Sequence, residues 1–151
     1  MVDGIDLWWE SNKGRFNTIK RIVVNMDNGP ECSGHRSQFL HRMVEFVDRE
    51  KVEVRLIYYP PYHSKYNGIE RYWGGLERSW NGHLLDSVET VLKRAENFVW
   101  RTVKSTVALM EGIYEKGIKL YGKEKKDLER RLHRSQTLPW WDITIPLLTV
   151  N

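Results

Sequence analysis

The stretch Arg21-Ile22-Val23-Val24-Asn25-Met26-Asp27-Asn28-Gly29-Pro30 decides how this chain folds. Its first half is apolar and rich in β-branched residues, a composition typical of a strand. The Asp-Asn-Gly-Pro that follows is a strong turn signal. We therefore predict a buried strand over residues 21–26 and a loop that begins at Asp27.

The sequence after this loop predicts a helix and then a second strand. Apolar residues recur at helical spacing between Ser37 and Glu50. Residues 52–59 then alternate, and Pro60-Pro61 ends the run. A strand, a helix and a strand in so short a span form a βαβ unit, whose two strands are parallel. Both loops should therefore open at one edge of the sheet, the edge at which sites in open α/β sheets are usually found.

The remaining segments are predicted to be helical. We expect a short helix around Leu7-Trp8-Trp9, helices that begin near Asn67 and near Asp86, and a charged helix from Lys123 to Arg134. Two strands are too few for a sheet that stands alone. We therefore expect strands that precede residue 1 to be missing, and the first strand to present an unpaired edge that favours self-association.

Composition restricts the class of protein. The 151 residues suffice for one domain with a hydrophobic core. The 24 Lys and Arg residues exceed the 20 Asp and Glu residues, and a net charge of +4 permits a nucleic-acid partner without requiring one. Cys32 is the only cysteine, which excludes an internal disulfide and disfavours a Cys-based zinc site. We find no signal peptide and no apolar run of about 18 residues, and we expect a cytoplasmic protein.

Two carboxylates are candidates for a metal site. Asp27 ends the first predicted strand, and Glu70 lies just inside the helix that follows the second. Carboxylate oxygens are the ligands that Mg²⁺ prefers, and paired metal ions support in-line phosphoryl transfer. Two structural interpretations stay open: Asp27-Asn28-Gly29 is also an ordinary turn, and Asn67 with Glu70 also fits a helix capping box.

Two long segments resemble the second and third acidic motifs of DDE-type insertion-sequence transposases. Residues 24–31 read Val-Asn-Met-Asp-Asn-Gly-Pro-Glu, and residues 58–74 read Tyr-Tyr-Pro-Pro-Tyr-His-Ser-Lys-Tyr-Asn-Gly-Ile-Glu-Arg-Tyr-Trp-Gly. The likeness continues through residues 76–90 and is greatest to the ISAzo-thirteen-like group. It spans about residues 8–120. The longer motif is specific, although it carries Gly68 where the family usually has Pro at the helix start.

The resemblance implies an RNase H-like (retroviral integrase-like) α/β core with C-terminal helices. Asp27 would be the second Asp and Glu70 the closing Glu of a triad that binds Mg²⁺ or Mn²⁺. Asn28 and His63 would support this site, while Lys65, Asn67 and Arg71 would contact DNA at transposon ends or targets. The parent enzyme would cleave DNA strands and join them to a target.

One departure from the family pattern concerns the first Asp of the triad. Asp3 and Asp6 precede a helix rather than a strand, so neither replaces it. We therefore expect residues 1–122 to be an N-terminally incomplete catalytic domain and residues 123–151 to be a charged helix and tail. The isolated chain would be inactive. The alternative is a catalytically dead protein that binds DNA or full-length transposase and regulates transposition. We also expect the chain to be able to form homo-oligomers. In a prokaryotic cell it would be associated with the nucleoid when it is bound to DNA.

Overall fold

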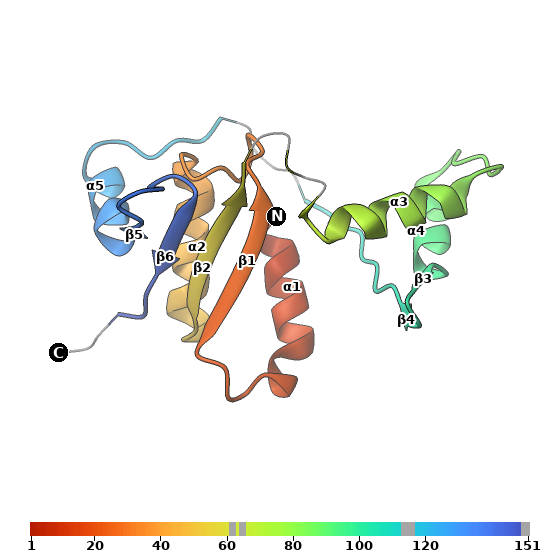
Figure 1. The fold of residues 1–151 in the computed structure, drawn as a ribbon, viewed down its shortest axis with the longest axis horizontal. Helices are drawn as coiled ribbons and strands as arrows, with labels where there is room; N and C mark the ends of the chain where they lie inside the picture. Colours follow the sequence, from red (N-terminus) through yellow and green to blue (C-terminus); the bar gives the residue numbers. More distant parts are fainter. Residues whose placement is uncertain (61–62, 64–65, 113–116, 149–151) are drawn as a thin grey trace. The chain divides into compact units, whose positions relative to one another are not determined.

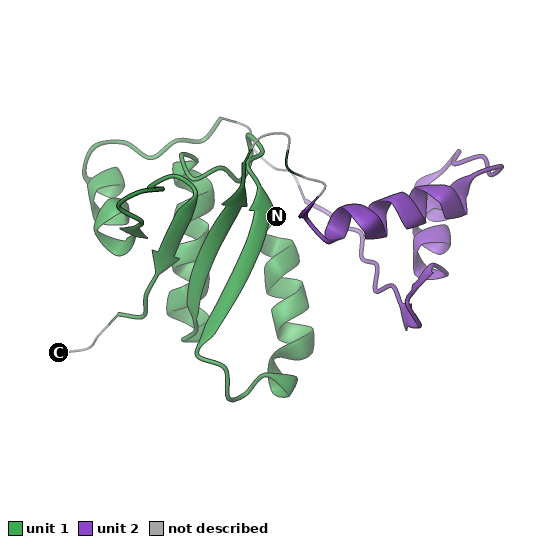
Figure 2. Cartoon of the chain, viewed as in Figure 1, with its two compact units in different colours: residues 1–64, 117–151 green, residues 65–116 purple. Residues whose placement is uncertain are grey.

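The computed structural model describes residues 1–60, 63, 66–112 and 117–148. The chain divides into two compact units (Figure 2). Unit 1 comprises residues 1–64 and 117–151, and unit 2 comprises residues 65–116. The predicted boundary after residue 122, between a catalytic domain and a charged helix with its tail, stays a prediction.

Unit 1 is built on a mixed four-stranded sheet in the order β1-β2-β6-β5 (Figure 1). Strands β1 (Arg21–Asp27) and β2 (Glu53–Tyr59) are parallel and in register from Arg21 with Glu53 to Asp27 with Tyr59. Helix α2 (Ser37–Glu50) connects them. The predicted βαβ unit is thereby confirmed, and its two strands end together at one edge.

Strand alternation directs one face of this sheet into the core. Val54, Leu56 and Tyr58 of β2 are buried, as predicted, and so are six apolar residues of α2: Phe39, Leu40, Met43, Val44, Phe46 and Val47. The core also takes in Val2 and Trp9 of α1 (Val2–Asn12) and Leu128 of α5 (Gly122–Arg131). Helix α1 continues into a short 3-10 turn, η1 (Lys13–Arg15). Three helices therefore pack on the same face.

The opposite face of the sheet is more open, and β1 differs there from its prediction. Only Met26 of β1 is buried, while Val23 is 49% exposed. The strand is therefore not a fully buried one. It lies at the edge of the four-stranded sheet, as the expected unpaired edge requires. The reason is that the apolar run Ile-Val-Val is covered on one side only.

The C-terminal tail supplies two strands that the sequence did not predict. Strand β6 (Asp142–Ile145) pairs antiparallel with β2, and β5 (His133–Arg134) pairs antiparallel with β6. Ile143 and Ile145 are fully buried. Such short strands carry little periodic signal. The pairing of β6 depends on β2, about 90 residues earlier in the chain, and β5 then pairs with β6.

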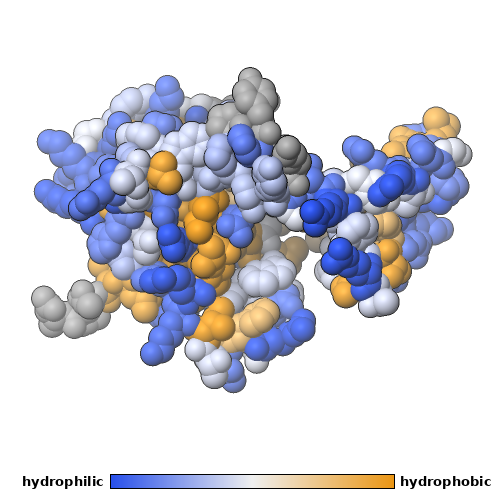
Figure 3. Space-filling view, viewed as in Figure 1, coloured by the Kyte–Doolittle hydropathy of each residue, from blue (hydrophilic) through white to orange (hydrophobic). Residues whose placement is uncertain are grey.

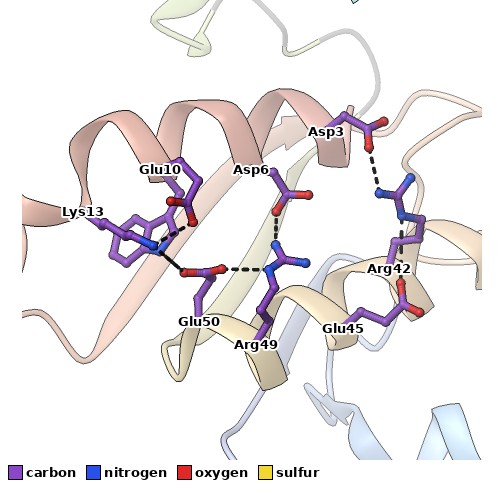
Figure 4. Close-up of polar contacts among 9 residues, drawn as sticks. Asp3, Asp6, Glu10, Lys13, Arg42, Glu45, Arg49 and Glu50 are labelled. Carbon is purple, nitrogen blue, oxygen red and sulfur yellow. Dashed lines mark hydrogen bonds and ion pairs between the residues drawn. The ribbon is translucent and has the colours of Figure 1, made fainter. Parts of the chain in front are cut away.

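Polar contacts join α1 to α2 (Figure 4). On α1, Asp3 lies 2.7 Å from Arg42 of α2, and Asp6 pairs with Arg49 of α2. Trp9 donates its indole N–H to Glu50 at 3.0 Å. Helix α5 is held by Arg131, which donates to both oxygens of Asp48 at 2.7 Å.

Unit 2 contains α3 (Ile69–Trp80), α4 (Val88–Glu96) and a hairpin of β3 (Val99–Trp100) and β4 (Val103–Lys104). The segment after the second loop is therefore not wholly helical. The predicted helix from residue 86 onward begins as expected, with the Ser87 hydroxyl accepting from the Thr90 N–H at 3.1 Å, but it ends at Glu96. Beyond Asn97 the sequence is dense in aromatic and β-branched residues, which favour strands.

Unit 2 has a thin core. Among its described residues only Leu76 is buried, and Trp73 of the same helix is 49% exposed. Apolar and charged side chains intermingle on its visible surface (Figure 3). Its order comes from aromatic packing: Tyr72 meets Trp73 and Phe98 edge-on, with ring centroids 5.1 and 5.3 Å apart.

None of the helices in the described part of the chain is both long enough and apolar enough to cross a membrane.

Candidate functional site

Asp27 is the last residue of β1 and is exposed. By strand alternation it belongs to the open face of the sheet, with Val23 and Asn25, while Met26 points into the core. Its register partner is Tyr59, the last residue of β2. The carboxylate of Asp27 therefore stands at the edge where the chain leaves β2 toward Glu70.

Two buried contacts hold the loop that follows Asp27. The Cys32 thiol lies 3.5 Å from the Asp27 carbonyl oxygen, and the Tyr58 hydroxyl donates to the Cys32 carbonyl at 2.7 Å. Burial raises the pKa of the Tyr58 hydroxyl and that of the Cys32 thiol. Both groups therefore keep their protons at neutral pH and can donate hydrogen bonds.

The C-terminal segment closes over the same loop. Arg134 donates to the Gly34 carbonyl at 3.1 Å and to the Pro139 carbonyl at 3.0 Å. The Trp140 ring stacks on His35 with centroids 4.1 Å apart, and the Arg134 guanidinium carbon lies 4.4 Å from the Trp140 ring centroid. Sequence reasoning missed this contact because its partners lie about 100 residues apart. The paired tryptophans at 140–141 were its only signal.

Glu70 is the second residue of α3 and is half-buried. Its backbone N–H donates to the Asn67 carbonyl at 3.1 Å, and the Asn67 side-chain oxygen accepts from the Ile69 N–H at 3.5 Å. Within the described residues the Glu70 carboxylate makes no hydrogen bond or ion pair, so the return bond of a capping box is absent there. Asn67 helps to begin the helix, and Glu70 is left available for a ligand.

The other predicted site residues surround these two carboxylates in the sequence. Asn28, His63 and Arg71 are exposed, and the His63 N–H donates to the Pro60 carbonyl at 3.1 Å. Lys65 lies outside the described residues. Asp27 belongs to unit 1 and Glu70 to unit 2. That their carboxylates meet stays a prediction.

Asp3 and Asp6 lie within helix α1, not before it, and both are engaged in ion pairs with α2. No group of three or more His, Cys, Asp or Glu side chains that could hold a metal ion occurs among the described residues. Two carboxylates alone would not form such a group.

The family model described as the Rhodopirellula transposase DDE domain matches residues 1–146 of this chain. No curated protein and no solved structure matches it.

Proposed function

This chain belongs to the family of Rhodopirellula transposase DDE domains, and we propose that Asp27 and Glu70 are the second and third acidic residues of its catalytic triad. The family implies DNA transposition by the parent protein, together with DNA binding and the use of divalent metal ions. The finer assignments below are our proposal: the two residues, Mg²⁺ or Mn²⁺ as the metal, and an RNase H-like fold.

The register of β1 with β2 carries the proposal. In this register Asp27 and Tyr59 lie side by side at the ends of their strands. Glu70 follows Tyr59 by only eleven residues in the sequence. Within unit 1, Asp27 lies on the more exposed face of the sheet. The mixed sheet with helices packed on one face supports an RNase H-like core.

The donor set fits a hard divalent cation, because both residues offer carboxylate oxygen and neither carboxylate is buried. When bound, such ions activate the attacking hydroxyl and stabilise the leaving oxygen of an in-line displacement at phosphorus. The protein's own task is to hold the two carboxylates in place. The contacts of Tyr58, Arg134 and Trp140 on the loop after Asp27 serve that task in unit 1.

The proposal assigns DNA contacts to residues next to Glu70. Arg71 is exposed, and Asn67 and Lys65 precede it in the loop that enters α3. Guanidinium, ammonium and amide groups there would bind phosphate oxygens and fix the strand without reading its sequence. His63 and Asn28 would support the site from the two loops. Another copy of the chain, or the full-length transposase, would join it in the DNA complex.

Metal-directed cleavage of the backbone tests the site directly. Fe²⁺ replaces Mg²⁺ in the purified chain, and ascorbate with peroxide then produces hydroxyl radicals at the bound ion. We expect cleavage at two places, near residue 27 and near residue 70, and the loss of both in Asp27→Asn. Glu77→Gln, which changes an exposed carboxylate of the same helix, should leave both in place. Cleavage at one place only would refute the shared site.

Transposition of a marked element whose transposase contains this chain tests the function. Asp27→Asn and Glu70→Gln should each lower its frequency by about 100-fold or more, since losing a metal ligand removes several kcal/mol of charge stabilisation. Glu77→Gln should leave it unchanged. Wild-type frequency in either site variant would overturn the proposal. The non-catalytic alternative makes a different prediction. This chain with the substitution Asp27→Asn, supplied in trans to the active transposase, would still change the transposition frequency.

A further inference from the structure

The hairpin of unit 2 carries a basic segment that the catalytic proposal does not use. From Asn97 to Met110 the chain has two cations, Arg101 and Lys104, and no acidic residue. Both cations are exposed. Helix α5 differs, because its cations alternate with carboxylates and two of them, Arg130 and Arg131, are paired with Asp127 and Asp48.

The turn of this hairpin has an unusual backbone. Arg101 and Thr102 have φ values of 48° and 70°, in the left-handed region that usually requires Gly or Asn. A β-branched threonine is disfavoured there, and such a conformation persists only where its surroundings hold it. The hairpin is therefore held by its neighbours.

Those neighbours belong to α3, the helix of Glu70. A Cβ on Gly75 would lie 2.7 Å from the Trp100 ring, so the ring is seated directly on the helix backbone. The Tyr72 and Ser105 hydroxyls are 2.8 Å apart, and the Ser105 N–H donates to the Phe98 carbonyl at 3.0 Å. The hairpin is therefore packed against α3.

Beside the hairpin lies a hollow of about 410 Å³. Its walls combine cations, hydroxyls and an amide with two apolar residues: Ser79, Thr90, Lys93, Arg94, Asn97, Phe98 and Val99. Arg94 is already in contact with His83, at 2.7 Å, whereas Lys93 is exposed. Val99 pairs with Lys104, and cross-strand partners share a face of a hairpin, so Lys104 lies on the face that borders the hollow.

We propose that this hollow, with Lys93, Arg94 and Lys104 around it and Arg101 at the turn, binds backbone phosphates of a DNA strand. The inference rests on the proposed function, since the hollow would bind the same DNA on which Glu70 acts. The hydroxyls of Ser79 and Thr90 and the amide of Asn97 donate within the chain, so the donors toward a phosphate are the Lys and Arg side chains. Phosphate contacts of this kind position a strand without reading its bases. Because the hairpin is seated on α3, binding there places Glu70 relative to the DNA.

The salt dependence of DNA binding tests this site. The affinity of the purified chain for a short duplex is measured against salt concentration for the wild type and for Lys93→Ala/Lys104→Ala. Each lost phosphate contact lowers the slope of log K against log salt by about 0.9, so the double variant should lose about 1.8. At 0.1 M salt this corresponds to roughly 60-fold weaker binding, if the two proteins bind equally at 1 M salt.

Two further variants make the result specific. Lys123→Ala/Lys125→Ala removes the same charge from exposed positions of α5 and should leave the slope unchanged. Lys93→Arg/Lys104→Arg keeps the charge and should restore the affinity. An unchanged slope in the alanine variant, or an equal loss in the α5 control, would overturn the inference. A wild-type chain that does not bind DNA would instead count against the proposed function itself.

Discussion

Gly34 is where the loop after Asp27 meets the C-terminal segment. A Cβ at this position would lie 2.2 Å from the Trp140 carbonyl oxygen and 2.9 Å from its carbonyl carbon. Neither atom can withdraw as a flexible side chain could. The same loop carries the carbonyl that Arg134 binds and the His35 ring on which Trp140 stacks. Because the side chain of glycine is a single hydrogen atom, the loop after Asp27 and the C-terminal segment can pack against each other at residue 34.

We predict that Gly34→Ala destabilises unit 1 by about 1–3 kcal/mol, the usual cost of forcing extra atoms into packed surroundings. Urea unfolding followed by tryptophan fluorescence measures the change. Gly14→Ala is the matched control, because a Cβ there meets nothing within 4 Å, and it should change the free energy of unfolding by less than about 0.5 kcal/mol. Equal effects of the two substitutions would contradict this account of residue 34.

At the scale of elements, one nearly buried carboxylate, that of Glu50, contributes to the packing of α1 on α2. The Glu50 side chain is 9% exposed. Burial acts to raise its pKa, but hydrogen bonds from Arg49 and from the Trp9 indole, with the nearby Lys13 ammonium, outweigh burial, and the pKa lies below its ordinary value. The folded protein therefore favours the ionised form of Glu50. The contacts of its carboxylate with Lys13 and Arg49 are drawn in Figure 4.

This lowered pKa predicts how stability changes with pH. A depressed carboxyl pKa contributes stability that is fully present above the unfolded value near 4.5 and is lost as pH falls through the folded value. Glu50→Gln keeps an oxygen that accepts from Trp9 and removes the charge. We expect the variant to be less stable than wild type at pH 7 and the difference to shrink below pH about 4.5. Urea unfolding across this range checks it, and a difference that grows on acidification would refute it.

At the scale of the whole molecule, the chain leaves unit 1 after residue 64 and returns at residue 117. The returning segment completes the sheet, since β6 lies beside β2 and β5 beside β6. Ile143 and Ile145 of β6 are fully buried although they lie within ten residues of the chain's end. Arg55 of β2 donates to both oxygens of Asp142 at 2.9 and 2.7 Å. The tail is therefore part of the core that holds Asp27.

We predict that Ile143→Ala destabilises unit 1 by about 2–5 kcal/mol, the cost of a cavity in a packed core. Leu148→Ala, five residues later and 58% exposed, serves as the control and should cost less than about 0.5 kcal/mol. Thermal unfolding followed by circular dichroism compares them. A small effect at residue 143 would show that β6 is not an integral strand of unit 1.

The sequence by itself determined the elements whose signals are local. The alternation of residues 52–59 and the helical spacing of residues 37–50 sufficed for the parallel βαβ unit, and parallel pairing alone brought both strand ends to one edge. The long motif around Glu70 indicated the family, which the match over residues 1–146 confirmed. These features depend on neighbours within about four residues or on rules of chain connection.

Only the tertiary structure decided the rest. Partners far along the chain decide the pairing of β6 with β2 and the contacts of Arg134 and Trp140 with the loop after Asp27. Competition between helix and strand decides the end of α4 at Glu96. Two- and four-residue strands have no periodicity of their own, because their stability comes from pairing and burial. The composition of residues 21–27 fits an edge strand as well as a fully buried strand. Only the position of β1 at the edge of the sheet, with one face exposed, distinguishes the two.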